Sequence, residues 1–146
     1  MFATMKKYLT ILVGLILSGS ALADFGDVKL VLSGFETNEG QVIISIYNGA
    51  EGFGEDDSNP FRIIKGAVQD LQYVETITLP EGEYAILVIH DINNNGELDT
   101  NFIGIPKEPI GASINKKKSR PDYDKSKFSV GKNDSITLEI AVYTIF

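Results

Sequence analysis

The sequence of 146 residues contains no cysteine and no tryptophan, and it has a single histidine, His90. Without cysteine, disulfide cross-links, thiol chemistry and thiolate zinc sites are all excluded. With one histidine, a metal site built from several imidazoles is excluded as well, and any Ser-His-Asp arrangement would depend on His90. The fold therefore has to hold without covalent staples.

The first 23 residues have the three-part organisation of a secretory signal peptide. Lys6 and Lys7 supply positive charge, an apolar run follows over 8–17, and Ala21-Leu22-Ala23 forms a small-x-small cleavage site. The apolar run is shorter than the roughly 20 residues that a membrane-spanning helix needs. We therefore expect cleavage after Ala23, a mature domain over 24–146 with no stable membrane span, and a periplasmic or secreted location.

The mature domain is expected to be acidic. The signal segment carries two lysines and no acid, so its removal changes the formal net charge from −7 to −9. This charge disfavours nucleic acid and anionic membrane surfaces as partners, and it favours cations. The remaining length is that of one domain of roughly 100–150 residues, which is enough to enclose a single hydrophobic core.

Short segments with an apolar residue at every second position recur along the mature chain, and this period predicts β-strands. The candidate strands cover residues 28–32, 42–46, 61–64, 71–79, 83–90 and 136–142. Segment 83–90 is apolar on both faces, so we expect a central strand that is covered on both sides. About seven short strands predict an all-β fold, a single β-sandwich with one long loop excursion over 91–127. Such long loops are usually functional or held in place by something.

The start of that excursion is a candidate calcium-binding loop. The predicted ligands are oxygen-bearing residues at near-alternate positions: Asp91, Asn93, Asn95, Glu97 and Asp99. This spacing, with Gly96 at the sixth position, matches the first three-quarters of an EF-hand-type loop, in which the seventh residue contributes its backbone carbonyl. Position twelve should be a bidentate Glu but is Phe102, so Glu108 or Asp122 is a candidate to complete the shell. With few formal charges, we expect weak Ca²⁺ binding, with a Kd of about 10⁻⁴–10⁻³ M.

Two other interpretations of this segment stay open. Asn and Asp also bond to their own backbone, so the segment could be an Asx-rich turn without any metal. His90, Asp91 and Glu108 could instead serve a metal-assisted hydrolase. No nucleophile accompanies His90, so a strand-end imidazole bonded to backbone or carboxylate, in a protein that is not an enzyme, is favoured.

A third function is an envelope or adhesive domain that recognises glycan or protein through the loop end of the sandwich. An exposed patch of Phe102, Ile105 and Ile110 would indicate it. The basic segment 115–120 could meet phosphates or an acidic glycan, but such runs are more often solvated loops.

Three segments together resemble a family of exported bacterial proteins named domain of unknown function 2141. They are 79–85 (Leu-Pro-Glu-Gly-Glu-Tyr-Ala), 90–101 and 104–108, and the resemblance extends over nearly the whole mature chain. The strand entrance near 79–84 is also similar to transthyretin-like and carboxypeptidase-regulatory-like domains. These resemblances imply a Greek-key β-sandwich, transthyretin-like or immunoglobulin-like, with about seven strands. They imply accessory or binding roles more than catalysis.

Taken together, the sequence predicts an exported, non-enzymatic β-sandwich module that binds calcium through loop 91–99. Its partner is expected to be a protein or a glycan of unknown identity.

Overall fold

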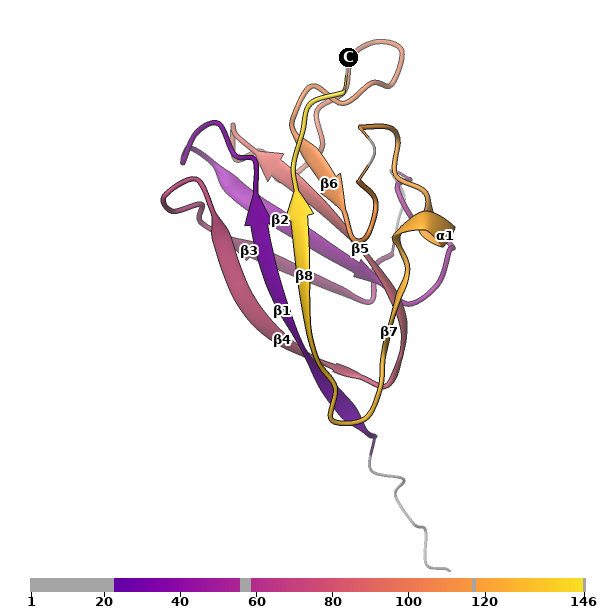
Figure 1. Cartoon of the computed structure of the whole chain (residues 1–146). Helices are drawn as coiled ribbons and strands as arrows, with labels where there is room; N and C mark the ends of the chain where they lie inside the picture. Colours follow the sequence, from indigo (N-terminus) through magenta and orange to yellow (C-terminus); the bar gives the residue numbers. More distant parts are fainter. Residues whose placement is uncertain (1–22, 56–58, 117, 146) are drawn as a thin grey trace, which may run out of the picture.

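The computed structural model describes residues 23–55, 59–116 and 118–145 (Figure 1). The elements follow in the order β1 (Phe25–Ser33), β2 (Gln41–Tyr47), β3 (Arg62–Gly66), β4 (Tyr73–Pro80), β5 (Gly82–Asp91), β6 (Ile110–Ala112), α1 (Tyr123–Ser126), β7 (Phe128–Val130) and β8 (Ser135–Ala141). The predicted signal peptide, residues 1–23, lies outside the described residues except for Ala23. In the part of the chain that is described, no helix is long and apolar enough to cross a membrane.

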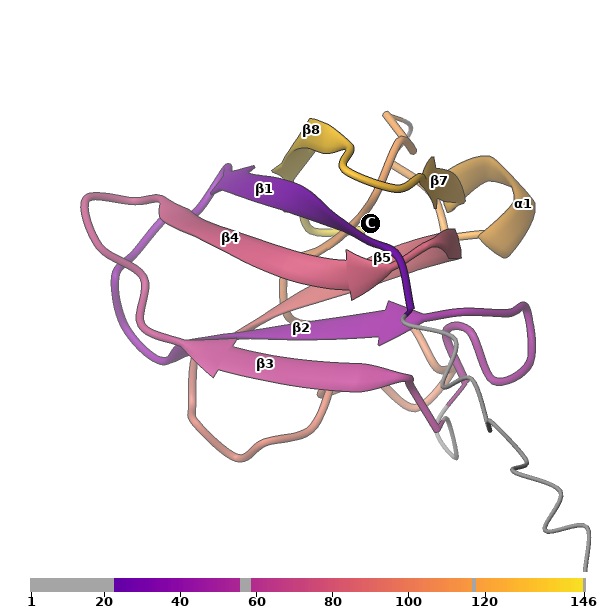
Figure 2. The ribbon, with the colours of Figure 1, turned by 90° about the horizontal axis from the view of Figure 1, so that it is seen from below.

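The strands form two sheets that pack face to face (Figures 1 and 2). The smaller sheet has the order β4-β1-β8, in which β1 is antiparallel to β4 and parallel to β8. The larger sheet has the order β3-β2-β5-β6, and β7 pairs with the start of β5. The predicted all-β sandwich is confirmed, with eight strands in the described residues.

The core lies between the sheets and follows from the period of two. Val28, Leu30 and Leu32 of β1 are fully buried, while the residues between them are exposed or half-buried. Each buried Val, Leu or Ile side chain stabilises the fold by about 1.5–3 kcal/mol. Strand β5 lies inside the larger sheet between β2 and β6; its core-facing residues from Tyr84 to His90 are buried, and its outward-facing residues after Glu83 are half-buried or buried. The prediction of a central strand is thus confirmed.

All six predicted strands are present, as β1, β2, β3, β4, β5 and β8. The prediction of one irregular excursion over 91–127 was wrong in part, because this segment contains β6 and α1. A strand of three residues and a helix of four residues are too short to produce a readable period. The uninterrupted loop therefore shrinks to 92–109, which follows directly from the end of β5.

Candidate functional site

Loop 92–109 leaves β5 at Asp91 and returns to it as β6. In Figure 2 it lies beyond the larger sheet, on the side away from the smaller sheet. It comes close to β3, because a methyl group added at Gly96 would lie 3.7 Å from Lys65 Nζ. The start of the loop therefore lies near the edge strand β3, on the side of the larger sheet away from the smaller sheet.

Asp91 is the buried anchor of the loop. Its side chain is 0% exposed, and it accepts hydrogen bonds from the backbone N–H of Asn95 to Oδ1 (3.1 Å) and of Gly96 to Oδ2 (2.9 Å). Gln41 on β2, which is paired with Asp91 in the sheet, donates to Oδ2 at 2.7 Å. Burial acts to raise the pKa of Asp91, but the Gln41 side chain and the backbone N–H groups of 94–96 hold the pKa below its usual value of 3.8. The carboxylate is therefore charged at neutral pH.

Glu108 closes the other end of the loop. Its side chain is 5% exposed; Oε1 accepts from Ile92 N and Oε2 from Asp99 N, each at 3.1 Å. A further backbone hydrogen bond, from Lys107 N to Asp99 O at 2.8 Å, lies beside this pair. One carboxylate thus fastens two points of the loop that are seven residues apart in sequence.

Two asparagines converge on the Asp99 carboxylate. Nδ2 of Asn93 donates to Asp99 Oδ2 at 2.6 Å, and Nδ2 of Asn95 donates to Asp99 Oδ1 at 3.1 Å. The oxygens of the same two amides accept backbone N–H groups two residues further on, from Asn95 and Glu97, as in Asx turns. The structure therefore brings Asp91, Asn93, Asn95 and Asp99 into one network, while Glu97 adds its backbone and keeps an exposed side chain.

The two residues predicted as candidates to complete the calcium ligand shell lie at different places in the structure. Glu108 lies at the loop, as described above, whereas Asp122 caps α1 by accepting from Lys125 N at 3.2 Å. Within residues 23–55, 59–116 and 118–145, no three His, Cys, Asp or Glu side chains group closely enough to hold a metal by themselves. Any cation here would need amide and backbone oxygens in addition to the carboxylates.

The charge of the site is only partly balanced. Asp91, Asp99 and Glu108 have no Lys or Arg within ion-pair distance among the described residues, whose ion pairs involve Lys127 and Lys132 only. Lys65, next to Gly96, is a nearby cation on the outer face of β3. Neither Lys65 nor Gln41 was found from the sequence; the pairing of β2 with β5 and with β3 puts them at the site, and this register is not readable from local patterns.

His90 sits on the other side of the same strand and faces the core. It is 0% exposed, its ring packs edge-on to Phe35 with centroids 4.9 Å apart, and Nε2 lies 2.9 Å from the carbonyl oxygen of Glu39. Nδ1 is buried and makes no hydrogen bond among the described residues. The ring is thus held between backbone and an aromatic side chain, away from the loop oxygens.

The far tip of the loop carries two exposed apolar residues. Phe102 is 98% exposed and Ile103 is 65% exposed, in a turn whose backbone N–H groups at 103 and 105 both donate to Asn101 Oδ1 at 3.0 Å. Of the expected patch of Phe102, Ile105 and Ile110, only Phe102 is fully exposed. Ile105 is half-buried, and Ile110 is buried because it begins β6.

A family model described as an uncharacterized protein conserved in bacteria, domain of unknown function 2141 (DUF2141), matches residues 30–137. This match covers β2 to β7 and loop 92–109 in full, with parts of β1 and β8, and it confirms the resemblance to this family seen in the sequence. No curated protein and no solved structure matches the chain.

Proposed function

The chain belongs to the bacterial DUF2141 family, and we propose that it is an exported, non-enzymatic binding module whose loop 92–109, together with Asp91, takes up calcium. The observation that carries this proposal is the pair of buried carboxylates, Asp91 and Glu108, at the two ends of one loop. Buried charges are normally paired or bound to metal. Here only N–H donors compensate them, and Asp99 adds a third negative charge to the same network.

The donor set suits a hard cation. Carboxylate, amide and backbone oxygens at alternating positions are what Ca²⁺ takes as ligands. The amide oxygens of Asn93 and Asn95 each accept one N–H and retain a second lone pair. A cation would have to compete with the amide hydrogens for the Asp99 carboxylate, so the binding is weak and suits a medium rich in calcium, such as the outside of a cell.

A second observation supports a role in partner binding. The same loop presents Phe102 and Ile103 to solvent on a turn held by Asn101. Calcium bound at the base of the loop would stiffen this tip and so lower the entropy lost when a partner is bound. The partner is a protein or a glycan with an apolar contact surface.

The burial of His90 argues against the metal-assisted hydrolase. A general base has to reach the proton that it removes, within about 2.6–3.2 Å or through one water. A ring enclosed by Phe35 and the backbone of Glu39 offers no such approach. We therefore propose that the module acts by binding rather than by catalysis.

The test is thermal unfolding of the mature domain in chelator, in millimolar calcium and in millimolar magnesium. A ligand that binds only the folded state stabilises it by RT ln(1 + [L]/Kd), so ten times the Kd stabilises the fold by about 1.4 kcal/mol. We expect a rise in Tm with calcium that magnesium does not reproduce.

Asp99→Asn should abolish the rise, since Asp99 is the residue on which the two asparagines converge. Asp122→Asn is the matched control, because it makes the same change at a helix cap away from the loop, and it should keep the rise. If wild type and Asp99→Asn respond alike, or if calcium and magnesium act equally, the loop is not a calcium site.

A further inference from the structure

Among the residues that the structure describes, strand β8 leaves one edge of the smaller sheet without a strand partner. Within this part of the chain β8 pairs only with β1, and the bonds at its two ends are Asp27 N to Asp134 O and Val142 N to Ser33 O, each at 2.8 Å. Backbone groups alternate in direction along a strand, so the even-numbered residues bond β1. The N–H and C=O groups of Ser135, Thr137 and Glu139 therefore point toward the open edge.

The edge is open over a limited length. Beyond Glu139 it is covered by β6, because Ile110 and Tyr143 exchange two backbone hydrogen bonds of 2.8 and 2.9 Å. A Cβ at Gly111 would lie only 2.7 Å from Ala141 O, which shows how closely the two backbones approach there. About five residues, 135–139, are left for an added strand.

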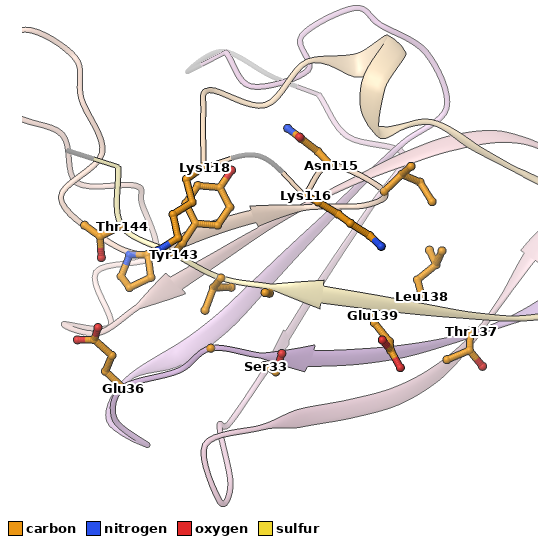
Figure 3. A pocket seen from close by; sticks show the side chains of 15 residues that line it. Ser33, Glu36, Asn115, Lys116, Lys118, Thr137, Leu138, Glu139, Tyr143 and Thr144 are labelled. Atoms are coloured by element: carbon orange, nitrogen blue, oxygen red, sulfur yellow. The ribbon is translucent and has the colours of Figure 1, made fainter.

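A groove of about 970 Å³ begins at this edge and extends past it to Glu36 and Thr144, so part of its volume borders residues 137–139 (Figure 3). Thr137, Leu138 and Glu139 of β8 line the groove together with Ile114, Lys116 and Lys118, and Glu36 lines it as well. In Figure 3 the Lys116 side chain extends from the segment after β6 toward β8. The groove thus combines an unused row of backbone donors and acceptors with an apolar group and a positive charge on the opposite wall.

Ile114 is held in a strained conformation on that wall. Its φ is +62°, and Asn115 N donates to Ser113 O at 2.6 Å across it, which is the geometry of the rarer, strained γ-turn. A β-branched residue with positive φ is a true outlier, and such strain gathers at ligand-binding positions. Ser113 is anchored below, since its Oγ accepts from Ile86 N at 2.9 Å and donates to Ser126 O at 2.5 Å. The turn keeps Ile114 53% exposed, facing the groove.

We propose that this groove binds an extended peptide segment of another polypeptide, which adds to the sheet as a strand beside Thr137 and Glu139. The chemistry of the occupant follows from the walls. Backbone N–H and C=O groups of the peptide satisfy the β8 edge, an apolar side chain packs on Ile114, and an acidic side chain faces Lys116. Strand addition of this kind takes its affinity from main-chain hydrogen bonds and its specificity from alternate side chains.

A second copy of the chain is a poorer occupant. Pairing two β8 edges would bring the Lys116 side chains of both copies to one seam, where the two positive charges repel each other. The opposite edge of the sheet is also less suited to strand addition, because Arg62 Nη1 already donates to Thr78 O of β4 at 3.2 Å. This proposal concerns a different surface from the calcium loop and does not depend on it.

The test uses a synthetic hexapeptide of alternating Val and Asp with blocked ends, and ¹⁵N-labelled mature domain. We expect amide shift changes confined to 113–116 and 135–139, and slower hydrogen exchange at the N–H groups of Thr137 and Glu139. Two N-methylated peptides provide a matched pair, each methylated at a different alternate set of residues. The peptide whose methylated N–H groups would face β8 should bind at least tenfold more weakly than the parent peptide. The other peptide should bind as the parent does.

Protein variants make the same comparison from the other side. Glu139→Pro removes one edge N–H, which edge strands tolerate, and should weaken binding, whereas Glu139→Gln should not. Thr76→Pro on β4 is the control. Because Glu81 N donates to Asp24 O at 2.7 Å, the odd-numbered residues of β4 form the hydrogen bonds to β1. The N–H of Thr76 therefore faces the other edge of the sheet, away from β8. This variant should bind like wild type.

Several results would overturn the proposal. The first is equal binding of the two N-methylated peptides to wild-type protein, and the second is a set of shift changes outside the two segments. The third is no binding at millimolar peptide, and the fourth is a dimer of the domain that forms at higher protein concentration and displaces the peptide. Absence of binding would leave Glu139 and Lys116 as charges that guard the edge against aggregation.

Discussion

Replacing Glu108 by Gln tests whether one buried carboxylate holds loop 92–109 together. The carboxylate accepts two backbone N–H groups, from Ile92 and Asp99, at 3.1 Å each. Glutamine keeps only one oxygen and turns an NH₂ group toward the other N–H. The loss of a hydrogen bond to a charged group is worth about 1.5–3 kcal/mol. Removing a buried negative charge offsets part of this loss, which leaves a destabilisation of about 2 kcal/mol.

The assay is urea denaturation and thermal unfolding of the mature domain in chelator. For a domain of this size, about 2 kcal/mol corresponds to a fall in Tm of roughly 6–12 °C. Hydrogen exchange supplies a local readout, since the N–H groups of Ile92 and Asp99 should lose protection in Glu108→Gln. Glu97→Gln changes the same charge at an exposed position of the loop and should stay within about 0.5 kcal/mol of wild type.

Equal stability of Glu108→Gln and wild type, with the two amides still protected, would show that the Glu108 carboxylate does not hold the loop. The loop would then be held by its Asx turns, and Glu108 would be a bystander. A large loss in both Glu108→Gln and Glu97→Gln would also contradict it, because the effect would then follow from charge and not from the two hydrogen bonds.

Three further predictions concern the surroundings of the loop. Gly40→Ala should cost about 3 kcal/mol or more in urea denaturation, because φ is +76° and the new Cβ would lie 2.1 Å from Asp91 O, whereas Gly49→Ala, with open space around it, should cost little. Lys65→Met should tighten calcium binding about fivefold in a calcium titration at low salt, since a cation about 8 Å away in water repels the divalent ion by roughly 1 kcal/mol; unchanged or weaker binding would count against it. The lowered pKa of Asp91 means that its contribution to stability is fully present above about pH 3.8 and is lost as the pH falls through the folded-state value. Without calcium, the stability gap between wild type and Asp91→Asn should therefore shrink as the pH falls below about 3.8, and a constant gap in acid denaturation would contradict this.

The sandwich was predictable because its strands obey the period of two. Val28, Leu30 and Leu32 alternate with exposed or half-buried residues, and the structure buries them as the pattern requires. β6 escaped prediction because it is only three residues long, and its burial at Ile110 also removed one member of the expected apolar patch. Ile103, which is 65% exposed, lies in that patch instead, and no periodicity in the sequence indicates its exposure.

The candidate loop was predictable from spacing, but its support was not. Asp91, Asn93, Asn95 and Asp99 meet because alternate residues in a tight coil point toward one centre, and Gly96 with its φ of +82° permits the turn. The supporting residues come from other strands, and strand register is a property of the whole fold.

Calcium binding by this loop can be measured by following the amide resonances of the mature domain during titration with calcium and with magnesium. We predict saturable shifts centred on Gly96, Glu97 and Asp99, with one Kd of about 10⁻⁴–10⁻³ M for calcium and a much weaker response to magnesium. Shifts that never saturate, that spread over exposed acidic residues across the surface, or that are the same for both cations would contradict the claim. They would identify the segment as an Asx turn closed by its own hydrogen bonds.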